Sequence, residues 1–244
     1  MPSHPDITTS PIILSLFIGK PKDLGTPSGT DWHNKPWRSA IFKESTTEPI
    51  HLDTLGHHGD GVQETKFHGG PDKALLAYPA NHYTYWQQQF PDTPSTYGWC
   101  GENWTLSNLD ETQACIGDTF IVGSATVQIS QPRQPCWKLS RRWQIKSFVR
   151  EVQRLGYNGF YLRVLQPGTV QVGDTLTLTD RPHPNWPTRR VHELLYDRST
   201  PPELLSQLSA LELLSTSTRS HFERRLQHPY HDDSAKRLKG ENGT

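Results

Sequence analysis

The chain has 244 residues and no formal net charge, because 25 lysines and arginines balance 25 aspartates and glutamates. Net charge therefore gives no sign of a nucleic-acid or membrane-surface partner. Hydrophobic residues make up only 33% of the chain, but eight Trp, eight Tyr and eight Phe supply large surfaces for burial. With 20 prolines and 18 glycines spread along the sequence, these figures predict one β-rich domain of many short elements and a small accessory unit.

The sequence shows no signal for export or for a cysteine framework. Its longest early apolar run, residues 12–18, is far shorter than the about 20 residues that span a bilayer, and no basic segment precedes it. The three cysteines, Cys100, Cys115 and Cys136, form no Cys-x-x-Cys pair, and their odd number argues against a disulfide framework or a zinc ribbon. We therefore expect a protein of the reducing cytoplasm, with neither signal peptide nor membrane anchor.

The N-terminal part of the chain predicts strands separated by irregular loops. Residues 1–11 are polar and rich in proline, which indicates a flexible tail, and the apolar run at 12–18 predicts a strand. The prolines and glycines of residues 20–36 indicate a long loop. Weaker patterns predict short strands within 38–52 and 59–67.

An aromatic segment follows and predicts a helix. Tyr83, Trp86 and Phe90 recur at helical spacing. Proline suits the first turn of a helix but cannot continue one, so we expect Pro79 near the start of this helix and Pro91 beyond its end.

The middle of the chain contains the clearest β pattern. Apolar and polar residues alternate over 116–131 on either side of Gly123-Ser124, which predicts a β-hairpin. Apolar residues at helical spacing over 145–155, followed by Gly156, predict an amphipathic helix that ends at the glycine. Residues 169–179 alternate again and predict a further strand.

The composition changes at residues 181–187, where prolines indicate a linker. Beyond it the apolar spacing predicts three short helices, one of which begins at a capping box in Thr200-Pro-Pro-Glu203. Such short helices bury little surface alone, so we expect them to pack on the β-rich domain or on one another. The predicted organisation is a barrel-like domain at 12–182, a three-helix module at 188–228, and flexible tails at 1–11 and 229–244.

Cys136 is the most informative of the cysteines. It follows a predicted strand in a loop stiffened by two prolines, and residues 131–154 contain seven basic residues and one acid, Glu151. Such surroundings favour the thiolate, which is the form that attacks electrophiles and binds soft metals. The alternative is a small buried apolar residue, which we assign to Cys100 and Cys115 because they lack basic neighbours.

The turn formed by His68-Gly69-Gly70-Pro71-Asp72-Lys73 is a second candidate site. Paired glycines allow backbone amides to converge on an anion, and His68 and Lys73 add donors. The spacing matches neither a Walker phosphate loop nor a dinucleotide fingerprint, so a tight turn without a ligand is the alternative.

Other polar residues give weaker signals. Asn103 could hydrogen-bond a heterocycle and Glu102 could pair with a basic residue near Cys136, although both could equally form a turn. His57-His58, with His51 nearby, suggests a metal site, but adjacent side chains rarely converge on one ion. The basic residues near the C-terminus are diluted by acids, which indicates a solvated helix and not a nucleic-acid site.

In their order and spacing, these motifs resemble the MOSC family, and within it the YiiM branch. The matching segments are His68–Leu75 with Tyr78-Pro79, Gly101–Asn103, Ile116–Asp118, Ser130–Arg133, Pro135-Cys136 and Lys138-Leu139. The resemblance covers residues 12–180, and residues 188–228 resemble the three-helix module that follows the MOSC domain in that branch. It implies a mainly β, barrel-like fold followed by a small helical module.

The resemblance also implies a cofactor and a reaction. MOSC domains bind the molybdenum cofactor, a pterin dithiolene that carries a phosphate, and the YiiM branch reduces N-hydroxylated purines such as 6-hydroxylaminopurine. Cys136 matches the cysteine that ligates molybdenum, and His68 is a candidate proton donor. The residues implied in cofactor binding are His68, Gly69, Gly70, Lys73, Asn103, Arg133 and Cys136, with Asn103 facing the pterin edge.

No segment resembles a flavin, haem or iron–sulfur site, so electrons would come from a separate reductase or small carrier. The substrate would be a small N-hydroxylated molecule, without nucleic-acid or membrane partners, and the oligomeric state is open. Trp137 and Trp143 would either stack on substrate or pack in the core. Two alternatives change the activity: a carrier or sulfur-handling protein for the cofactor, and a cysteine-dependent acyl transferase or hydrolase with His68 as base.

Overall fold

The computed structural model describes residues 9–94, 96–228 and 234–239. The strands are β1 (Ile13–Ile18), β2 (Lys22–Leu24), β3 (Trp37–Ser39), β4 (Glu44–Thr46), β5 (Ile50–Asp53), β6 (Gly56–His57), β7 (Leu75–Pro79), β8 (Trp104–Leu106), β9 (Thr119–Val122), β10 (Ala125–Pro132), β11 (Phe160–Gln166), β12 (Gly168–Val170) and β13 (Thr177–Asp180). The helices are α1 (Thr65–His68), the 3₁₀ turn η1 (Pro71–Lys73), α2 (His82–Gln89), α3 (Lys138–Trp143), α4 (Phe148–Leu155), α5 (Thr188–Tyr196), α6 (Pro202–Ser209), α7 (Thr216–Gln227) and α8 (Ser234–Lys239). No helix in this part of the chain is long and apolar enough to cross a membrane.

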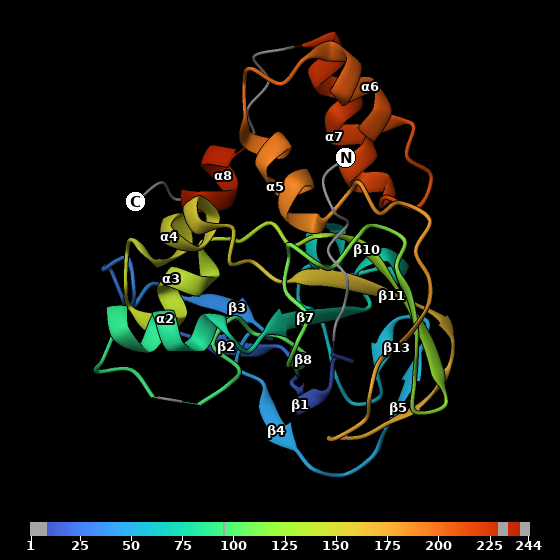
Figure 1. The fold of residues 1–244 in the computed structure, drawn as a ribbon. Coiled ribbons are helices and arrows are strands. Elements are labelled where there is room, and N and C mark those ends of the chain that lie inside the picture. Colours follow the sequence, from blue (N-terminus) through green and yellow to red (C-terminus); the bar gives the residue numbers. More distant parts are fainter. Residues whose placement is uncertain (1–8, 95, 229–233, 240–244) are drawn as a thin grey trace.

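Eight strands form one mixed sheet in the order β13-β9-β10-β11-β7-β8-β1-β4. Neighbouring strands are antiparallel except β7 and β8, which run parallel. Smaller sheets, β12-β5-β6 and β2-β3, lie beside it. The large sheet curls into a half-barrel, and α5, α6 and α7 stack above it (Figure 1). The predicted β-rich domain followed by a helical module is confirmed.

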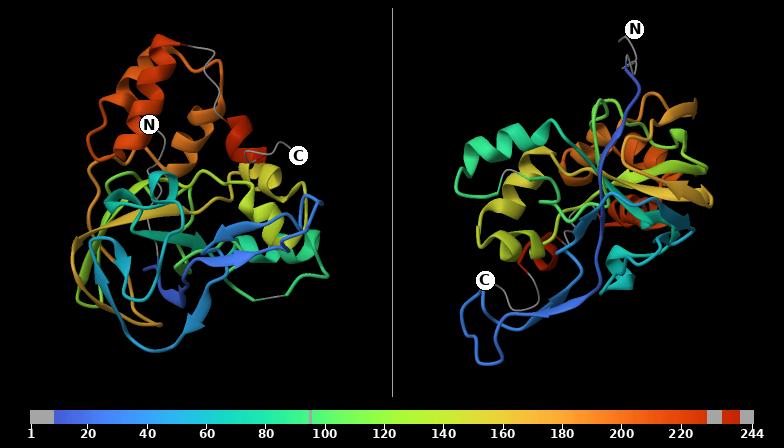
Figure 2. Two further views of the ribbon diagram at one scale, coloured as in Figure 1. Left: turned by 180° about the vertical axis from the view of Figure 1, so that it is seen from behind. Right: turned by 90° about the horizontal axis from the view of Figure 1, so that it is seen from below.

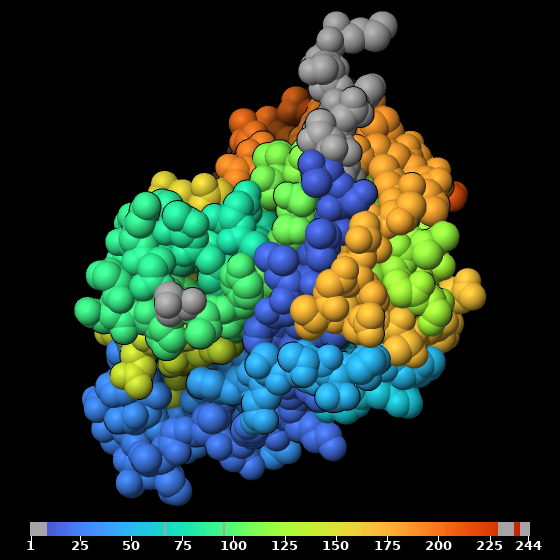
Figure 3. All heavy atoms as spheres, turned by 60° about the horizontal axis from the view of Figure 1, so that its bottom comes forward, coloured from blue at the N-terminus to red at the C-terminus, as the bar shows by residue number. Residues whose placement is uncertain are grey.

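Strand β1 ties the two ends of the β-rich domain together. It pairs with β4 and β8. Its start also contacts the segment before β13, because the Ile13 amide donates to the Asp174 carbonyl at 3.0 Å and the Leu176 amide donates to the Pro11 carbonyl at 2.8 Å. Figure 3 shows this blue segment lying between the green and orange parts of the chain.

The three C-terminal helices share the hydrophobic core of the sheet. Leu195, Leu208 and Phe222, from α5, α6 and α7, belong to the same buried cluster as Val127 and Ile129 of β10. Each fully buried side chain of this size stabilises the fold by about 1.5–3 kcal/mol. The helices therefore pack on the β-rich domain, as their short length predicts, and Figure 2 shows them gathered at one end of the molecule.

An aromatic cluster holds α2, α3 and α4 beside the sheet. Tyr78 of β7, Trp86 of α2 and Phe148 of α4 are fully buried in it, and the Trp86 Nε1 donates to the Tyr78 hydroxyl at 2.6 Å. Leu139 of α3 lies in the same cluster. Because Leu139 comes three residues after Cys136, this packing fixes the segment that follows the cysteine.

Two local predictions are confirmed by backbone geometry. Strands β9 and β10 form the predicted hairpin, and Gly123 turns between them at φ +55°, where a Cβ would lie 2.2 Å from the Thr169 carbonyl oxygen. Helix α4 ends at Gly156, whose left-handed φ of +70° lets its amide donate to the Val152 carbonyl at 3.1 Å.

Other local predictions are wrong, because contacts between segments that are distant in the sequence override the local patterns. The expected loop at 20–36 contains β2, which pairs with β3, and the expected strand at 59–67 contains the start of α1. Pro79 is the last residue of β7, where it pairs with Leu106 of β8, and α2 begins only at His82. The Thr200 hydroxyl donates to the Asp197 carbonyl at 2.7 Å, so it does not cap α6.

The expected flexible tails are only partly open to comparison. Residues 1–8, 229–233 and 240–244 lie outside the described residues. Residues 234–239 form α8, so the expectation is wrong for them. The Arg237 guanidinium donates to the Pro135 carbonyl, and the Trp137 amide donates to the Arg237 carbonyl at 2.9 Å. Helix α8 thus packs against the loop that carries Cys136.

Candidate functional site

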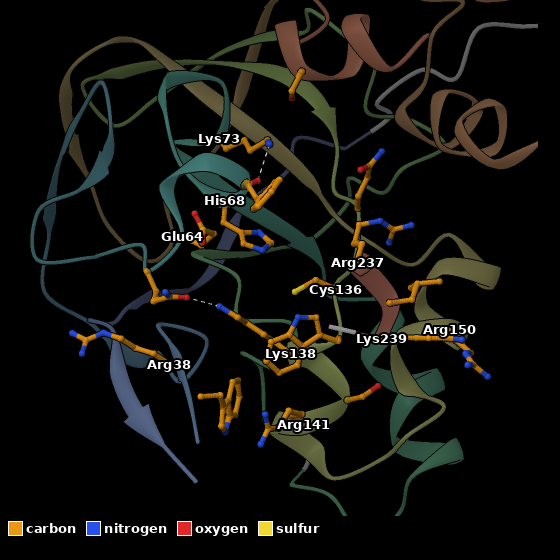
Figure 4. Close-up of a pocket in the computed structure, with 18 of the residues that line it drawn as sticks. Arg38, Glu64, His68, Lys73, Cys136, Lys138, Arg141, Arg150, Arg237 and Lys239 are labelled. Atoms are coloured by element: carbon orange, nitrogen blue, oxygen red, sulfur yellow. Dashed lines mark hydrogen bonds between the residues drawn. The ribbon is translucent and has the colours of Figure 1, made fainter. Parts of the chain in front are cut away.

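Two cavities meet at Cys136. The larger has a volume of about 1120 Å³ and the smaller about 520 Å³. The residues that line both are Gln63, Glu64, His68, Lys73, Cys136, Lys138 and Tyr161. Figure 4 shows Cys136 in the middle of the larger cavity, between His68 and Lys138. A group bound to the Cys136 sulfur would therefore be accessible from both cavities.

The connection from β10 to α3 positions the sulfur. Strand β10 ends at Pro132 and α3 begins at Lys138, which leaves a short loop around Cys136. Within it the Arg133 amide donates to the Gly159 carbonyl at 3.0 Å, and the Leu139 amide donates to the Cys136 carbonyl at 3.1 Å. Together with the contacts from α8, these bonds fix the backbone on both sides of the cysteine.

The surroundings of Cys136 stabilise its thiolate. Burial alone would raise the pKa of the thiol. The neighbouring His68 imidazole and the Arg133 guanidinium oppose this effect by favouring the negative charge. A hydrogen bond with the Lys138 backbone adds to them, and the pKa of the thiol falls to about 6. Cys136 is therefore largely ionised at neutral pH.

Iodoacetamide is expected to modify Cys136 much faster than the other cysteines near neutral pH, because burial raises the pKa of Cys100 and Cys115 to about 12. The Cys136 rate should rise with pH and reach half its maximum near pH 6, where half of the thiol is ionised. Peptide mass spectrometry after timed alkylation measures this midpoint. In the variant His68→Gln the midpoint should move to higher pH, and an unmoved midpoint would show that His68 does not act on the sulfur.

The basic residues that follow Cys136 in the sequence do not all act on it. Arg141 stacks over two tryptophan rings in the larger cavity, and Arg142 donates to a backbone carbonyl at 2.6 Å. The direction of the pKa shift agrees with the sequence prediction. Its principal source, His68, comes from a segment that precedes Cys136 by more than 60 residues.

The glycine turn forms part of the wall of the smaller cavity. Gly70 has a left-handed φ of +92°, and a Cβ at this position would meet no atom within 4 Å, so its inner side is open. The turn is anchored at Asp72, which pairs with Arg163 of β11 at 2.7 Å and accepts from the Thr216 amide of α7 at 3.1 Å. Both the sheet and the helical module therefore hold the turn in place.

Arg133 is buried beside the smaller cavity, with 5% of its surface exposed. Its Nη2 donates to the Cys100 carbonyl at 3.4 Å, while its Nη1 has no hydrogen-bond partner among the described residues. No carboxylate in the described part of the chain forms an ion pair with it. Because a buried guanidinium nitrogen without a hydrogen-bond partner is unfavourable, this position suits an anionic ligand.

Asn103 and Glu102 are already engaged by the protein. The Asn103 amide accepts from the Leu76 amide at 3.1 Å and donates to the Asp60 carboxylate at 2.7 Å, so it lies at the cavity wall but its polar edge is used. The Glu102 carboxylate accepts from the Gly98 and Cys100 amides at 2.8 and 3.0 Å. Glu102 forms no ion pair with a basic residue near Cys136 among the described residues, but burial lowers the pKa of the Arg142 guanidinium and the charge of Glu102 opposes this effect.

The smaller cavity collects all seven residues that the sequence analysis connects with a cofactor. They are His68, Gly69, Gly70, Lys73, Asn103, Arg133 and Cys136. Lys73 Nζ donates to the Phe67 carbonyl at 2.8 Å, which leaves it further donors. Segments that are up to 68 positions apart in the sequence thus converge on one wall.

The histidines considered for a metal site do not form one. His51 and His58 lie with ring centroids 5.2 Å apart, whereas His57 accepts a hydrogen bond from Trp104 Nε1 at 2.8 Å. Within the described ranges no three His, Cys, Asp or Glu side chains are grouped so as to hold a metal ion. His57 is a buried structural residue, and burial lowers its pKa to about 4.

The sequence analysis missed the charge of the larger cavity. Ten cationic residues line it, against one acid, Glu64. They are Lys35, Arg38, Lys73, Lys138, Arg141, Lys146, Arg150, Arg224, Arg237 and Lys239. No local signal reveals this group, because its members come from β3 and the loop before it, from η1, from the segment that runs from α3 to α4, and from α7 and α8. Of the two tryptophans considered for stacking, Trp137 lines this cavity, whereas Trp143 packs on Trp99.

The chemistry of the junction fits a bound group that combines a soft metal with an anionic tail. Cys136 supplies an ionised sulfur, which soft metals prefer. Arg133 supplies an unpartnered guanidinium nitrogen, and Gly70 supplies open space beside backbone. All three features line the smaller cavity.

Comparison with known proteins identifies matches for both parts of the chain. Residues 64–177 match the MOSC domain and residues 186–228 match the YiiM-like, 3-alpha helix domain. "Uncharacterized protein YflK" of Bacillus subtilis (strain 168) is 36% identical over 210 residues, which cover 86% of this chain and 92% of that protein. "Reductase" of Gibberella moniliformis (strain M3125 / FGSC 7600) is 32% identical over 178 residues, which cover 72% of this chain but 32% of that protein. The crystal structure of YiiM from Geobacillus stearothermophilus superimposes with a TM-score of 0.73 at 32% identity, covering 88% of this chain and 99% of that chain.

Proposed function

The chain belongs to the MOSC domain family and to its YiiM-like branch, and from this membership we propose that it is a molybdenum cofactor-dependent reductase of N-hydroxylated bases such as 6-hydroxylaminopurine. A relative named "Reductase" supports an enzymatic role. The observation that carries the proposal is the junction itself: an ionised Cys136 where two cavities meet, beside an unpartnered Arg133.

Each residue of the junction has a role toward the cofactor in this proposal. The Cys136 thiolate would ligate molybdenum, because a soft, immobile and ionised sulfur suits a soft metal. Arg133, the backbone of Gly69-Gly70 and Lys73 would hold the anionic phosphate. Asn103 would shape the wall without donating to the pterin. When bound, the cofactor supplies the two-electron chemistry that breaks the N–O bond.

The reaction consumes two electrons and two protons. The N–O bond of the hydroxylamino group breaks, the nitrogen becomes an amine, and the oxygen leaves as water. His68 lies beside Cys136 and lines both cavities, so we assign it to hold a proton near the departing oxygen. The electrons would come from a separate reductase or a small electron carrier that docks transiently.

Purified protein from a host that makes the cofactor tests the proposal. We expect about one molybdenum and one molybdopterin per chain, and conversion of 6-hydroxylaminopurine to adenine by the dithionite-reduced protein, followed by chromatography. Stoichiometric cofactor without turnover would support a carrier in place of a reductase. Cofactor-free protein that is rapidly acylated at Cys136 would support an acyl transferase or hydrolase.

A further inference from the structure

We propose that the larger cavity is a nucleoside phosphate subsite, so that the enzyme prefers the nucleotide of the N-hydroxylated purine to the free base. The inference rests on the proposed function and names the substrate class of the same site. Three properties of the cavity carry it: its size, its charge and its aromatic wall.

The larger cavity shares its inner end with the part of the site that suits the cofactor and extends beyond it. Arg133 and the glycine pair Gly69-Gly70 line the smaller cavity and not the larger one. Pockets for one small ligand usually enclose about 300–1,000 Å³, and the larger cavity alone encloses about 1120 Å³. A bare purine would therefore leave most of this space to solvent.

The charge of the larger cavity exceeds what a neutral base can use. Of its ten cationic residues, only Arg38 forms an ion pair within the described residues, with Asp23 at 3.0 Å. The other nine form no ion pair there, although the whole chain has no net charge. Cations concentrated in a cavity attract anionic ligands and hold phosphate by charge-assisted hydrogen bonds.

An aromatic wall lies next to the sulfur. Trp137 follows Cys136 in the chain and is half-exposed in the larger cavity, with its ring centroid 5.8 Å from that of Trp37. The Arg141 guanidinium lies 5.1 and 5.4 Å from the two ring centroids and fixes their arrangement. Aromatic rings in such walls stack on nucleobases. A purine on Trp137 would thus be held beside Cys136.

The phosphate end of the subsite is assigned to Lys146 and Arg150. Both are exposed, line the cavity and come from the segment that leads into α4 and from α4 itself. Figure 4 shows Arg150 on the same side of the cavity as Lys239 of α8. The nearby acid, Glu151, pairs with Arg154 at 2.7 Å and not with either of them. The phosphate would therefore meet cations that have no competing carboxylate.

Calorimetric titration of the full-length protein with AMP and with adenosine tests the subsite. AMP carries the base that the reduction yields together with a phosphate, and we expect it to bind at least tenfold more tightly than adenosine. The double variant Lys146→Gln, Arg150→Gln should lose most of this preference. The matched control Arg190→Gln removes an exposed cation of α5 that lines neither cavity and forms no ion pair within the described residues, and it should keep this preference. Equal binding of AMP and adenosine by the unmodified protein, or an unaffected double variant, would overturn the inference.

Kinetics of the cofactor-loaded enzyme distinguish a substrate nucleotide from a nucleotide on the cofactor. We expect kcat/KM for the monophosphate of 6-hydroxylaminopurine riboside to exceed that for the free base at least tenfold, and the released pterin to carry no nucleotide. A pterin dinucleotide would overturn the assignment to substrate. If kcat/KM for the free base equals that for the nucleotide, the inference fails and the proposed reductase stands. If neither is reduced, the proposed function fails, and the AMP titration decides on the subsite independently.

Discussion

The variant Cys136→Ser is expected to reduce 6-hydroxylaminopurine at least about 100-fold more slowly than the unmodified protein. Replacing a residue that only supports a metal ligand lowers activity by up to about 100-fold, and replacing the ligand itself should cost at least as much. The Cys136 thiol is ionised at neutral pH because its pKa is about 6. A serine hydroxyl stays protonated there, and its hard oxygen is a poor ligand for a soft metal. Chromatography of adenine formed by dithionite-reduced enzyme measures the loss, and molybdenum analysis shows whether metal binding fails with it.

The matched control is Cys115→Ser. Cys115 is also fully buried but lines neither cavity, and its Sγ lies 3.6 Å from the carbonyl oxygens of Gln113 and Pro184, so a serine hydroxyl would find acceptors. This variant should keep nearly full activity. Full activity in Cys136→Ser would show that the sulfur is not the ligand. An equal loss in both variants would point to damage of the fold, which thermal unfolding detects.

Those parts of the candidate site that are formed by consecutive residues could be predicted from the sequence. The loop that carries Cys136 follows from a hairpin strand and two prolines, and the glycine turn follows from residues that tolerate left-handed backbone. The low pKa of the thiol could be predicted in direction, because basic residues cluster after Cys136. Its principal cause could not, since His68 reaches the sulfur only through the fold.

The larger cavity could not be predicted, because its charge exists only after folding. In sequence, Lys35, Arg150 and Lys239 lie in three unrelated segments, and each resembles an ordinary solvated cation. The sequence predicts a flexible tail at residues 229–244, which include α8. Helix α8 is held in place by hydrogen bonds of its backbone and of the Arg237 side chain to the loop that carries Cys136. Hydrophobic periodicity in the sequence gives no indication of such contacts. Convergence of this kind depends on tertiary packing and not on local propensity.

The helical module belongs to the site as well as to the core. Asp72 of the glycine turn accepts from the Thr216 amide at 3.1 Å, and the Ser215 hydroxyl donates to Gln131 of β10 at 2.6 Å. Arg224 of α7 lines the larger cavity. A change in how α7 packs would therefore displace the glycine turn and one wall of the cavity together. The module that the sequence indicates as an accessory unit thus forms part of the larger cavity and holds the glycine turn.

The second large effect is expected from Arg133→Met, which should reduce the cofactor retained after dialysis by about 10- to 100-fold. A hydrogen bond to a charged group contributes about 1.5–3 kcal/mol, and its loss weakens binding by about this factor. Methionine fills a similar volume without the charge. The free energy of unfolding of the cofactor-free Arg133→Met variant should equal that of the unmodified protein or exceed it by up to about 4 kcal/mol. The reason is that the replaced guanidinium is buried and one of its nitrogens has no hydrogen-bond partner. Pterin fluorescence measures retention, and urea unfolding measures stability.

Arg225→Met is the control that separates a ligand-binding arginine from a structural one. Arg225 is as buried as Arg133, with 5% of its surface exposed, but its guanidinium donates to the carbonyls of Leu194, Leu195 and Asp197 at 2.5, 3.3 and 2.6 Å. Its loss leaves buried acceptors without donors, so the protein should be destabilised by about 2–4 kcal/mol while it keeps its cofactor affinity. If Arg133→Met instead destabilises the cofactor-free protein as much and retains the cofactor, Arg133 is a structural residue. Arg133 and Arg225 are equally buried, but their replacement is expected to have opposite effects on stability. The protein supplies acceptors for the Arg225 guanidinium, whereas one guanidinium nitrogen of Arg133 has no partner.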